Sequence, residues 1–376
     1  MRVRSPGLYL HVPYCASKCL YCDFHSETDL ACVQGWPDAV AAEAKLYRGR
    51  FAPFGTLYIG GGTPSLLGPD DFERLSGVLY GAFRFEEGFE FTVEANPDDL
   101  GGEILSLYRS IGVNRLSIGV QSFDNRALRL LGRRHDASQA AMAIEAARNA
   151  GFSNISIDLI YALPGQTVES WRDTLERALL FDPEHLSCYE LILESGTPLA
   201  GMIRDGSVRE ESEEAKREIF LSTHEMLSKR GYIHYEVSNY ARGAEYISRH
   251  NSRYWDHTPY LGLGPSAHSF DGRRRWWNVR ANGEYEGKVR SGEPPLQGEE
   301  VLTGEQLILE KLYLGFRMLK GFELDLLGAL PGGTELVREL ERTGIVLIEN
   351  DRVVPTPRGY LFSCLLYTSP SPRDRS

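Results

Sequence analysis

Runs of apolar, β-favouring residues alternate with longer amphipathic segments over the first two thirds of the chain. Six such runs predict strands, at residues 8–12, 56–59, 89–94, 115–120, 155–161 and 186–193. The segments between them have helix-like patterns and predict helices at residues 37–50, 69–83, 99–111, 137–150 and 168–181. Regular strand–helix alternation indicates parallel strands joined by right-handed crossovers, and therefore an α/β fold.

Polar and Gly-rich residues follow the predicted strands and help to choose between two arrangements of the six units. An open doubly wound sheet and a partial barrel both agree with the alternation. Such turns come directly after four strands, at residues 60–64, 94–97, 121–123 and 164–167. The carboxyl ends of barrel strands share one mouth, where active sites are built. We therefore predict a partial (β/α)6 barrel of the TIM type.

The last third of the chain predicts a smaller unit. After a long helix over residues 210–230, the Gly-, Pro- and Glu-rich stretch 283–300 indicates a linker. Helices at residues 304–320 and 334–343 then precede a short hairpin at residues 345–354. Helices followed by a hairpin suggest a small winged-helix-like module, which can pack or cap without binding DNA.

Three parts follow from this pattern. They are a barrel with its extension (1–290), a winged-helix-like domain (291–364) and a tail (365–376). The tail, LLYTSPSPRDRS, is unlike the end of a folded domain and resembles translated adaptor sequence at the ends of some metagenomic fragments. We expect it to be non-native, so that the native C-terminus is missing and Cys364 is under the same suspicion.

Composition and charge restrict the class of protein. The chain is 42% hydrophobic and 25% charged, which is ordinary for a globular protein, and its net charge of −11 argues against a nucleic-acid scaffold. The first fourteen residues show no signal peptide, and no apolar run approaches the roughly 20 residues of a membrane helix. We expect a cytoplasmic protein that binds no nucleic acid.

Three of the six cysteines fall within eight residues, as Cys15-x-x-x-Cys19-x-x-Cys22. Clustered thiols in a reducing compartment usually indicate metal or redox chemistry. Three thiolates can ligate three irons of a [4Fe–4S] cluster, which normally takes four, and leave one iron open. That iron could chelate the amino and carboxylate groups of a bound molecule. A zinc site with His11 or His25 as the fourth ligand is the alternative.

The cysteine loop resembles the signature of the radical SAM superfamily. The resemblance lies in the run Tyr9-Leu-His-Val-Pro-Tyr-Cys15-Ala-Ser-Lys-Cys19-Leu-Tyr-Cys22-Asp-Phe24. Later motifs, between about residue 8 and residue 362, are similar to one branch, shared by oxygen-independent coproporphyrinogen dehydrogenases and heme chaperones of the HemW type. The resemblance implies a radical SAM partial barrel that carries a [4Fe–4S] cluster and S-adenosylmethionine.

The resemblance also implies which residues contact S-adenosylmethionine. They are Tyr9, Gly61, Gly62, Thr63, Glu94, Gln121, Arg133 and Asp158. Acids and amides suit an ammonium group and ribose hydroxyls, and the forked donors of arginine suit a carboxylate. Alone, the Gly-rich turn would be an ordinary turn; its meaning comes from its place after a strand and a three-cysteine loop. Arg134 is the alternative to Arg133.

Three features favour the chaperones over the dehydrogenases. Phe24 stands where the dehydrogenases carry a fourth cysteine, and only fourteen residues precede Cys15, where they carry a substantial extension. The run His250-Asn-Ser-Arg-Tyr-Trp255 matches the HNxxYW motif of the chaperone branch. Imidazole is a common axial ligand of heme iron, and Tyr and Trp offer flat apolar surfaces.

His250 is therefore expected to associate with heme, although a histidine and two aromatics that pack the rim of the barrel would show the same motif. His268, after two glycines, is a second candidate, and it could instead line the cofactor pocket. His257 is a third. Residues 273–275 are arginines that could meet heme propionates, but a solvated charge run explains them as well.

The favoured function is a heme chaperone that passes heme to acceptor proteins, with the cluster and S-adenosylmethionine in a regulatory or redox role. The alternative is an oxygen-independent coproporphyrinogen III dehydrogenase, which would use S-adenosylmethionine in the oxidative decarboxylation of porphyrinogen propionates. A zinc-bound structural module ranks third. The resemblance further implies an electron donor such as flavodoxin or ferredoxin, and it is compatible with peripheral association with membrane-bound acceptors.

Overall fold

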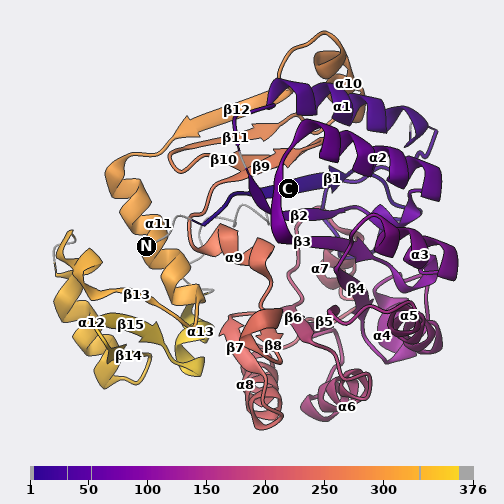
Figure 1. Ribbon diagram of the computed structural model, residues 1–376. Coiled ribbons are helices and arrows are strands. Elements are labelled where there is room, and N and C mark those ends of the chain that lie inside the picture. Colours follow the sequence, from indigo (N-terminus) through magenta and orange to yellow (C-terminus); the bar gives the residue numbers. More distant parts are fainter. Residues whose placement is uncertain (1–3, 32, 52, 330–331, 364–376) are drawn as a thin grey trace.

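The computed structural model describes residues 4–31, 33–51, 53–329 and 332–363 (Figure 1). Within these residues the strands form one sheet of twelve and one of three. The strands of the large sheet, in spatial order, are β12 (Leu296–Val301), β11 (Arg274–Asn278), β10 (His268–Phe270), β9 (Tyr260–Leu263), β1 (Gly7–Val12), β2 (Phe54–Gly61), β3 (Phe85–Ala95), β4 (Arg115–Gln121), β5 (Ile155–Tyr161), β6 (His185–Glu190), β8 (Asn239–Ala241) and β7 (Ile233–Glu236). The predictions made for Cys364 and the tail lie outside the described residues.

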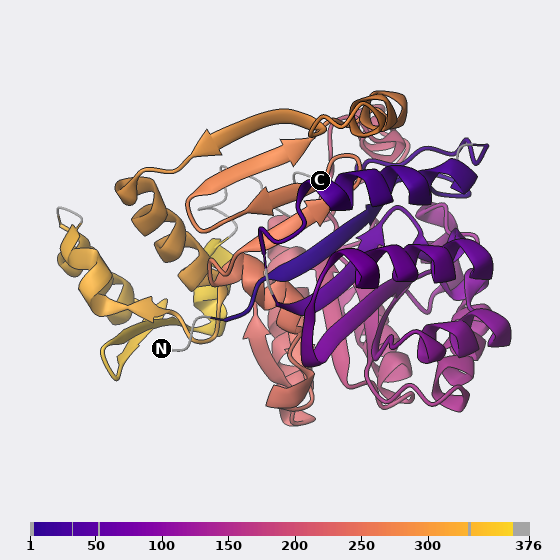
Figure 2. The same cartoon turned by 45° about the horizontal axis from the view of Figure 1, so that its top comes forward.

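The predicted α/β fold is confirmed, because β1 to β6 form a run of parallel strands in chain order. Helices connect them and cover the outside of the curved sheet (Figures 1 and 2). The helices and 3-10 helices of this part are η1 (Val33–Gly35), α1 (Trp36–Leu46), η2 (Pro64–Leu66), α2 (Pro69–Ala82), η3 (Pro97–Asp99), α3 (Gly102–Ser110), α4 (Asn125–Leu130), α5 (Ala137–Asn149) and α6 (Val168–Leu179).

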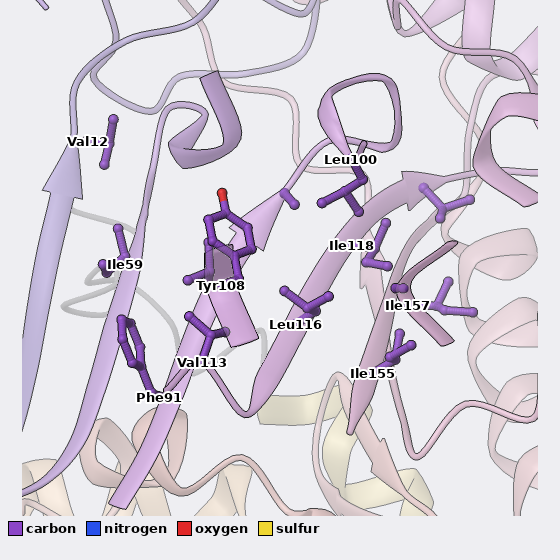
Figure 3. Packing of buried hydrophobic residues seen from close by; sticks show 14 of the residues in the cluster. Val12, Ile59, Phe91, Leu100, Tyr108, Val113, Leu116, Ile118, Ile155 and Ile157 are labelled. Atoms are coloured by element: carbon purple, nitrogen blue, oxygen red, sulfur yellow. The ribbon is translucent and has the colours of Figure 1, made fainter. Parts of the chain in front are cut away.

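Alternating side chains explain why these strands form a barrel wall with two different faces. The apolar positions, such as Ile59, Phe91 and Leu116, are fully buried against the helical layer, where Tyr108 of α3 packs among them (Figure 3). Each such side chain stabilises the fold by about 1.5–3 kcal/mol relative to an exposed one. The residues between them are often polar and face the interior, which places hydrogen-bonding groups inside the barrel.

The sheet continues beyond the six predicted strands at both ends. At one end β9 pairs with β1 in parallel, and β10, β11 and β12 follow in antiparallel order. At the other end β8 and β7 pair antiparallel beyond β6. The remaining helices of this part are α7 (Pro198–Arg204), α8 (Glu213–Lys229), η4 (Ala244–Tyr246), α9 (Arg249–Trp255) and α10 (Asn282–Arg290).

The linker predicted over residues 283–300 is wrong. This stretch contains α10, which buries Tyr285 and Val289, and β12, which pairs with β11. The Gly and Glu content of this stretch suggested a loop. Helix α10 buries only two apolar side chains, Tyr285 and Val289, so its sequence shows little of the apolar periodicity by which a helix is predicted. The division of the chain at residue 290 stays a prediction, although β12 lies after it and belongs to the large sheet.

The C-terminal part has the predicted helices and hairpin. Its elements are α11 (Gly304–Arg317), β13 (Phe322–Glu323), η5 (Leu324–Ala329), α12 (Gly333–Arg342), β14 (Val346–Glu349), β15 (Arg352–Pro355) and α13 (Pro357–Ser363). Its three strands form an antiparallel sheet in the order β13-β15-β14, set to one side of the barrel (Figure 2). Phe322, Val346 and Val353 belong to a separate core, which supports a small winged-helix-like domain. Among the described residues, no helix has the length and apolar character needed to cross a membrane.

Candidate functional site

The cysteine loop follows β1 and is held in place by backbone hydrogen bonds on several sides. Cys15 N–H donates to the Glu27 carbonyl (3.0 Å), and Glu27 N–H donates to the Pro13 carbonyl (2.8 Å). Leu20 N–H donates to the Leu131 carbonyl (3.1 Å), which attaches the middle of the loop to the segment after α4. The loop is therefore fixed at the mouth of the barrel, where the strands end.

The three thiols of this loop are free and half-buried. The Thr63 hydroxyl donates to Cys15 Sγ (3.4 Å), and Arg133 Nη1 donates to Cys19 Sγ (3.4 Å). Burial raises the pKa of the Cys22 thiol to about 11. This thiol therefore stays protonated near neutral pH until a bound metal displaces its proton. Hydrogen bonds to the sulfurs are one of the features by which proteins tune iron–sulfur clusters.

The donor set fits a [4Fe–4S] cluster better than a zinc ion. In the described part of the chain, no three His, Cys, Asp or Glu side chains are grouped to hold a single ion. A cubane instead takes each thiolate at a different iron. His11, one suggested zinc ligand, is engaged at both nitrogens: Nε2–H donates to the His25 carbonyl (2.9 Å), and Nδ1 accepts from the Tyr9 hydroxyl (3.1 Å). Burial lowers the pKa of His11 to about 4, so this ring is neutral.

The glycines of the turn after β2 are required by close packing against β1 and the cysteine loop. A Cβ on Gly62 would lie 2.4 Å from the Tyr14 carbonyl oxygen. Gly61 has a φ of +110°, and a Cβ there would lie 2.7 Å from the His11 ring. Thr63 N–H donates to the same Tyr14 carbonyl (2.7 Å). The turn therefore offers bare backbone directly beside the thiols, as a closely bound ligand would need.

Glu94 lies at the end of β3 on the interior face. Its carboxylate accepts hydrogen bonds from the Tyr58 hydroxyl (2.6 Å) and from Gly61 N–H (3.2 Å). These contacts orient the carboxylate beside the Gly-rich turn and leave it half-buried. A carboxylate in this position can accept hydrogen bonds from an ammonium group or a hydroxyl of a ligand.

The structure separates Arg133 from Arg134, which the sequence leaves as alternatives. Arg133 turns inward, where Nη2 donates to the Gly119 carbonyl (2.8 Å) and Nη1 to Cys19 Sγ. Arg134 turns outward and pairs with Asp98 and Asp99. The geometry therefore favours Arg133 as the cation beside a bound ligand.

The last two predicted contacts with S-adenosylmethionine are Gln121, at the end of β4, and Asp158, within β5. Gln121 has a φ of +64°, an unusual conformation for a residue with a side chain, and such strain is common at functional sites. Asp158 accepts hydrogen bonds from the hydroxyls of Ser117 (2.7 Å) and Ser156 (3.0 Å). These bonds compensate the desolvation of its carboxylate and orient it on the interior face.

One cavity joins three groups of residues that are far apart in the sequence. Its walls are Tyr9, Phe24, Tyr58, Gly61, Glu94, His250, Asn251, Tyr254, Tyr260 and His268. The cysteine loop contributes Phe24, the predicted cofactor contacts contribute Gly61 and Glu94, and the HNxxYW motif contributes His250. Four of the residues predicted from the resemblance therefore line one cavity, as does the second heme candidate His268, and the other predicted contacts do not. The four are Tyr9, Gly61, Glu94 and His250.

His250 is packed more tightly than a ligand for iron would be expected to be. Only 1% of it is exposed. Its Nδ1 is hydrogen-bonded to Thr56 Oγ1 (2.8 Å), its Nε2 to the Tyr254 hydroxyl (3.0 Å), and its ring stacks on Tyr58 with centroids 5.0 Å apart. Heme ligation by His250 would require one of these two hydrogen bonds to break, because an imidazole binds iron through one nitrogen and can keep the hydrogen bond at the other.

The other residues of the motif connect α9 to the C-terminal domain. Tyr254 and Trp255 belong to a core cluster with Leu314 and Met318, on α11 and at its end. His257 pairs with Glu310 of α11 (3.3 Å), and although burial opposes it, hydrogen bonds with His257 and Arg275 lower the pKa of Glu310 to about 2. Trp255 and His257 therefore serve a domain contact and do not line the cavity.

Two residues of the site belong to no sequence motif and are not predicted from the sequence. Tyr58 lines the cavity, and Glu90 holds the start of α9. Tyr58 lies between Thr56 and Gly60 on the interior face of β2. Glu90, which is 6% exposed, accepts hydrogen bonds from the backbone N–H groups of Arg249 (2.9 Å) and His250 (2.8 Å). The two-residue alternation along β2 and β3 is the signal that would have found both.

Comparisons with known proteins agree with this geometry. The family model described as "Radical SAM superfamily" matches residues 9–178. The chain is 35% identical to "Heme chaperone HemW" of Mycobacterium tuberculosis over 364 residues, which cover 95% of this chain and 92% of that protein. It is 32% identical to "Heme chaperone HemW" of Bacillus subtilis over 370 residues, or 94% and 96% of the two chains.

Among solved structures, the chain is similar to coproporphyrinogen III oxidase (HemN) from Escherichia coli, described as a radical SAM enzyme. The TM-score is 0.82 and the sequence identity is 26%, and the match covers 96% of this chain and 89% of that one. The similarity extends over the barrel and the C-terminal domain together.

Proposed function

Because the chain belongs to the HemW family of heme chaperones, within the radical SAM superfamily, we propose that it binds heme and transfers it to acceptor proteins. The observation that carries this proposal is similarity to these chaperones over nearly the whole chain. Phe24 supports it as well, because the position of a fourth cysteine in the dehydrogenases is filled by an exposed aromatic ring on the cavity wall.

The superfamily implies a [4Fe–4S] cluster and S-adenosylmethionine, and we assign their binding to residues at the mouth of the barrel. Cys15, Cys19 and Cys22 hold the cluster. The residues around S-adenosylmethionine are Tyr9, Gly61, Gly62, Thr63, Glu94, Gln121, Arg133 and Asp158. When bound, the cluster supplies one-electron chemistry to the site, and an electron donor such as flavodoxin or ferredoxin would reduce it. His250 contributes to the wall of the heme-binding cavity.

A heme titration of the full chain with a reconstituted cluster tests the proposal. We expect one absorption change that saturates with heme, followed by transfer of the heme to an apo-protein that normally contains it. Separation of the two proteins after mixing would show where the heme resides. Failure to take up heme with the cluster intact would contradict the function.

The fold similarity to coproporphyrinogen III oxidase supports one competing function. The same preparation, reduced under anaerobic conditions and supplied with S-adenosylmethionine, should be incubated with coproporphyrinogen III. We expect no substantial conversion to protoporphyrinogen. Rapid conversion would reverse the ranking of the two functions and would assign the cavity to a porphyrinogen.

A further inference from the structure

A row of buried, hydrogen-bonded side chains crosses the interior of the barrel and ends at Asp158. The Ser156 hydroxyl donates to Asp158 Oδ1 (3.0 Å), and Ser156 Oγ is also hydrogen-bonded to His185 Nδ1 (2.8 Å). His185 Nε2 is in turn hydrogen-bonded to the Tyr235 hydroxyl (2.8 Å). Ser156 and His185 are fully buried, and Tyr235 is 3% exposed. These four residues form the Asp158 network, and the proposed function gives a role only to Asp158.

The strand register explains how the Asp158 network is assembled. His185 is the first residue of β6 and lies opposite Ser156 of β5. The next residue, Leu186, is buried in the outer hydrophobic core, so the alternation of side chains turns His185 to the interior. Tyr235 comes from β7, at the end of the large sheet. Leu319 N–H donates to the Tyr235 carbonyl (2.9 Å), which fixes this end of the network against the segment after α11.

The hydrogen bonds of the Asp158 network have one consistent direction. Ser156 has a single hydroxyl hydrogen and gives it to Asp158, so Ser156 Oγ accepts from His185 Nδ1–H. A neutral imidazole with its hydrogen on Nδ1 has an acceptor at Nε2, and this nitrogen accepts from the Tyr235 hydroxyl. Every donor of the row therefore points towards the Asp158 carboxylate. Hydrogen bonds aligned in this way polarise and strengthen one another.

We propose that His185 is a positioning residue for S-adenosylmethionine, which acts through Ser156 by holding the Asp158 carboxylate in the orientation that the ligand meets. This inference rests on the proposed S-adenosylmethionine site and deepens it. The Ser117 hydroxyl holds the other oxygen, Asp158 Oδ2, from β4 (2.7 Å). A carboxylate has about four acceptor positions, so two hydroxyls leave room for a hydroxyl or ammonium group of the ligand. A carboxylate that is fixed before binding spares the ligand the entropy cost of ordering it.

His234 is a second buried histidine of this region and is a matched control. It is 5% exposed and precedes Tyr235 on β7, so the alternation of side chains turns it to the opposite face of the strand. Its Nδ1 is hydrogen-bonded to His224 Nδ1 of α8 (3.0 Å), and its Nε2–H donates to the Val237 carbonyl (3.2 Å). These hydrogen bonds lead away from Asp158. Loss of His234 should therefore affect packing without affecting the ligand.

Calorimetric titration of the full, cluster-reconstituted chain with S-adenosylmethionine tests the proposal. His185→Phe keeps a ring and removes the hydrogen bonds to Ser156 and Tyr235, and we expect it to weaken binding about threefold to tenfold. His185→Asn keeps an amide N–H near the place of Nδ1–H and should restore most of the affinity. His234→Phe should lower the stability of the fold and leave the affinity unchanged. Iron content and circular dichroism show whether each variant has its cluster and is folded.

A double-mutant cycle with Asp158→Asn separates positioning from a general loss of structure. In the Asp158→Asn background, His185→Phe should cause no further loss of affinity, because His185 acts through the carboxylate. Fully additive losses would overturn the proposal, as would an unchanged affinity in folded His185→Phe or an equal loss in His234→Phe. If Asp158→Asn binds too weakly to measure, the comparison of His185→Phe, His185→Asn and His234→Phe decides the question.

A second variant covers the case in which His185→Phe does not fold. Tyr235→Phe removes one hydroxyl at the far end of the Asp158 network and should weaken binding about twofold. An unchanged affinity in that variant would then overturn the proposal. If the parent chain binds no S-adenosylmethionine although its cluster is intact, the proposed site itself fails and the role of His185 with it. That result is distinct from any effect of the variants.

Discussion

Arg317 of α11 lies over the ring of Trp255, with 4.1 Å between its Cζ and the ring centroid. The same guanidinium donates from Nε to the fully buried Glu236 (2.8 Å). This stacking joins the C-terminal domain to Trp255, the last residue of the HNxxYW motif, which directly follows the cavity-lining Tyr254. The motif is therefore shared between a cavity wall and a domain contact.

The first prediction concerns this domain contact. Trp255→Ala should lower the free energy of unfolding by about 3–5 kcal/mol, because it empties a packed aromatic site. Arg317→Ala should also be destabilising by roughly 3 kcal/mol, because it leaves the buried Glu236 without its cation. Urea denaturation measures both. Lys229→Ala, which removes an exposed pair with Glu225, should change stability by less than about 0.5 kcal/mol. Equal effects in all three variants would contradict the assigned contact.

The second prediction concerns the cluster. Replacing Cys15, Cys19 or Cys22 by Ser should each abolish the [4Fe–4S] cluster, since each thiolate serves a different iron. Iron and acid-labile sulfide analysis after anaerobic reconstitution measures the loss. Cys188→Ala is the matched control: that cysteine is 3% exposed in β6, far from the loop in sequence, and its loss should leave the iron content unchanged. A cluster that survives any one of the loop substitutions would contradict the ligand assignment.

The third prediction separates the two neighbouring arginines. Arg133→Ala should lower the reduction potential of the cluster, because a positive charge at Cys19 Sγ favours the more negative, reduced form. It should also weaken S-adenosylmethionine binding. Arg134→Ala should change neither, since Arg134 pairs with Asp98 and Asp99 on the outside. A redox titration and a calorimetric titration give the two values, and reversed behaviour would show that the ligand lies beside Arg134.

The fourth prediction concerns pH. Burial raises the pKa of Glu43 to about 7 from 4.5, although three hydrogen bonds oppose the shift. The folded chain therefore binds this proton more tightly than the unfolded chain, so its contribution to stability is present below pH 4.5 and is lost as the pH rises towards 7. The loss is on the order of 1–3 kcal/mol.

Glu43→Gln tests this dependence, because the amide resembles the protonated acid. The variant should equal the parent chain near pH 5 and exceed its stability near pH 8, as measured by urea denaturation at the two values. An identical pH dependence in both proteins would show that Glu43 does not titrate in this range.

The fifth prediction concerns the Gly-rich turn. Gly62→Ala should destabilise the chain and abolish S-adenosylmethionine binding, because the new Cβ would collide with the Tyr14 carbonyl. The matched change Gly77→Ala lies within α2 and meets no atom within 4 Å, so it should stabilise the chain by about 0.5–1 kcal/mol. Thermal unfolding and a ligand titration report on both. Tolerance of alanine at Gly62 would contradict the close approach seen there.

The parallel strands and their helices could be predicted from the sequence because their apolar residues recur with clear periods. β12 and α10 could not, for a physical reason. β12 is an edge strand with no buried side chain, and α10 buries only Tyr285 and Val289 of its apolar residues, so neither has a strong hydrophobic pattern. The short α4 was also missed, and its Asp124 cap, which accepts from Arg126 N–H (2.7 Å), is the local signal for it.

In the candidate site, too, some features could be predicted from the sequence and others could not. The three cysteines and the Gly-rich turn lie close together in the sequence or after a strand, so their spacing is informative. The environment of His250 depends on Thr56 and Tyr254, which reach it from β2 and from the next turn of α9. Which of Arg133 and Arg134 faces the cofactor site depends on the direction in which each side chain points, inward towards Cys19 or outward towards Asp98 and Asp99. Such orientations arise only when distant strands pack.

The cavity is shared by residues from two proposed binding sites. Gly61 and Glu94, from the predicted S-adenosylmethionine site, line the same cavity as Phe24 and His250. A heme bound in this cavity would contact side chains that also face the S-adenosylmethionine site. Binding of the transported heme and exchange of S-adenosylmethionine would therefore influence each other, although the two ligands have different roles.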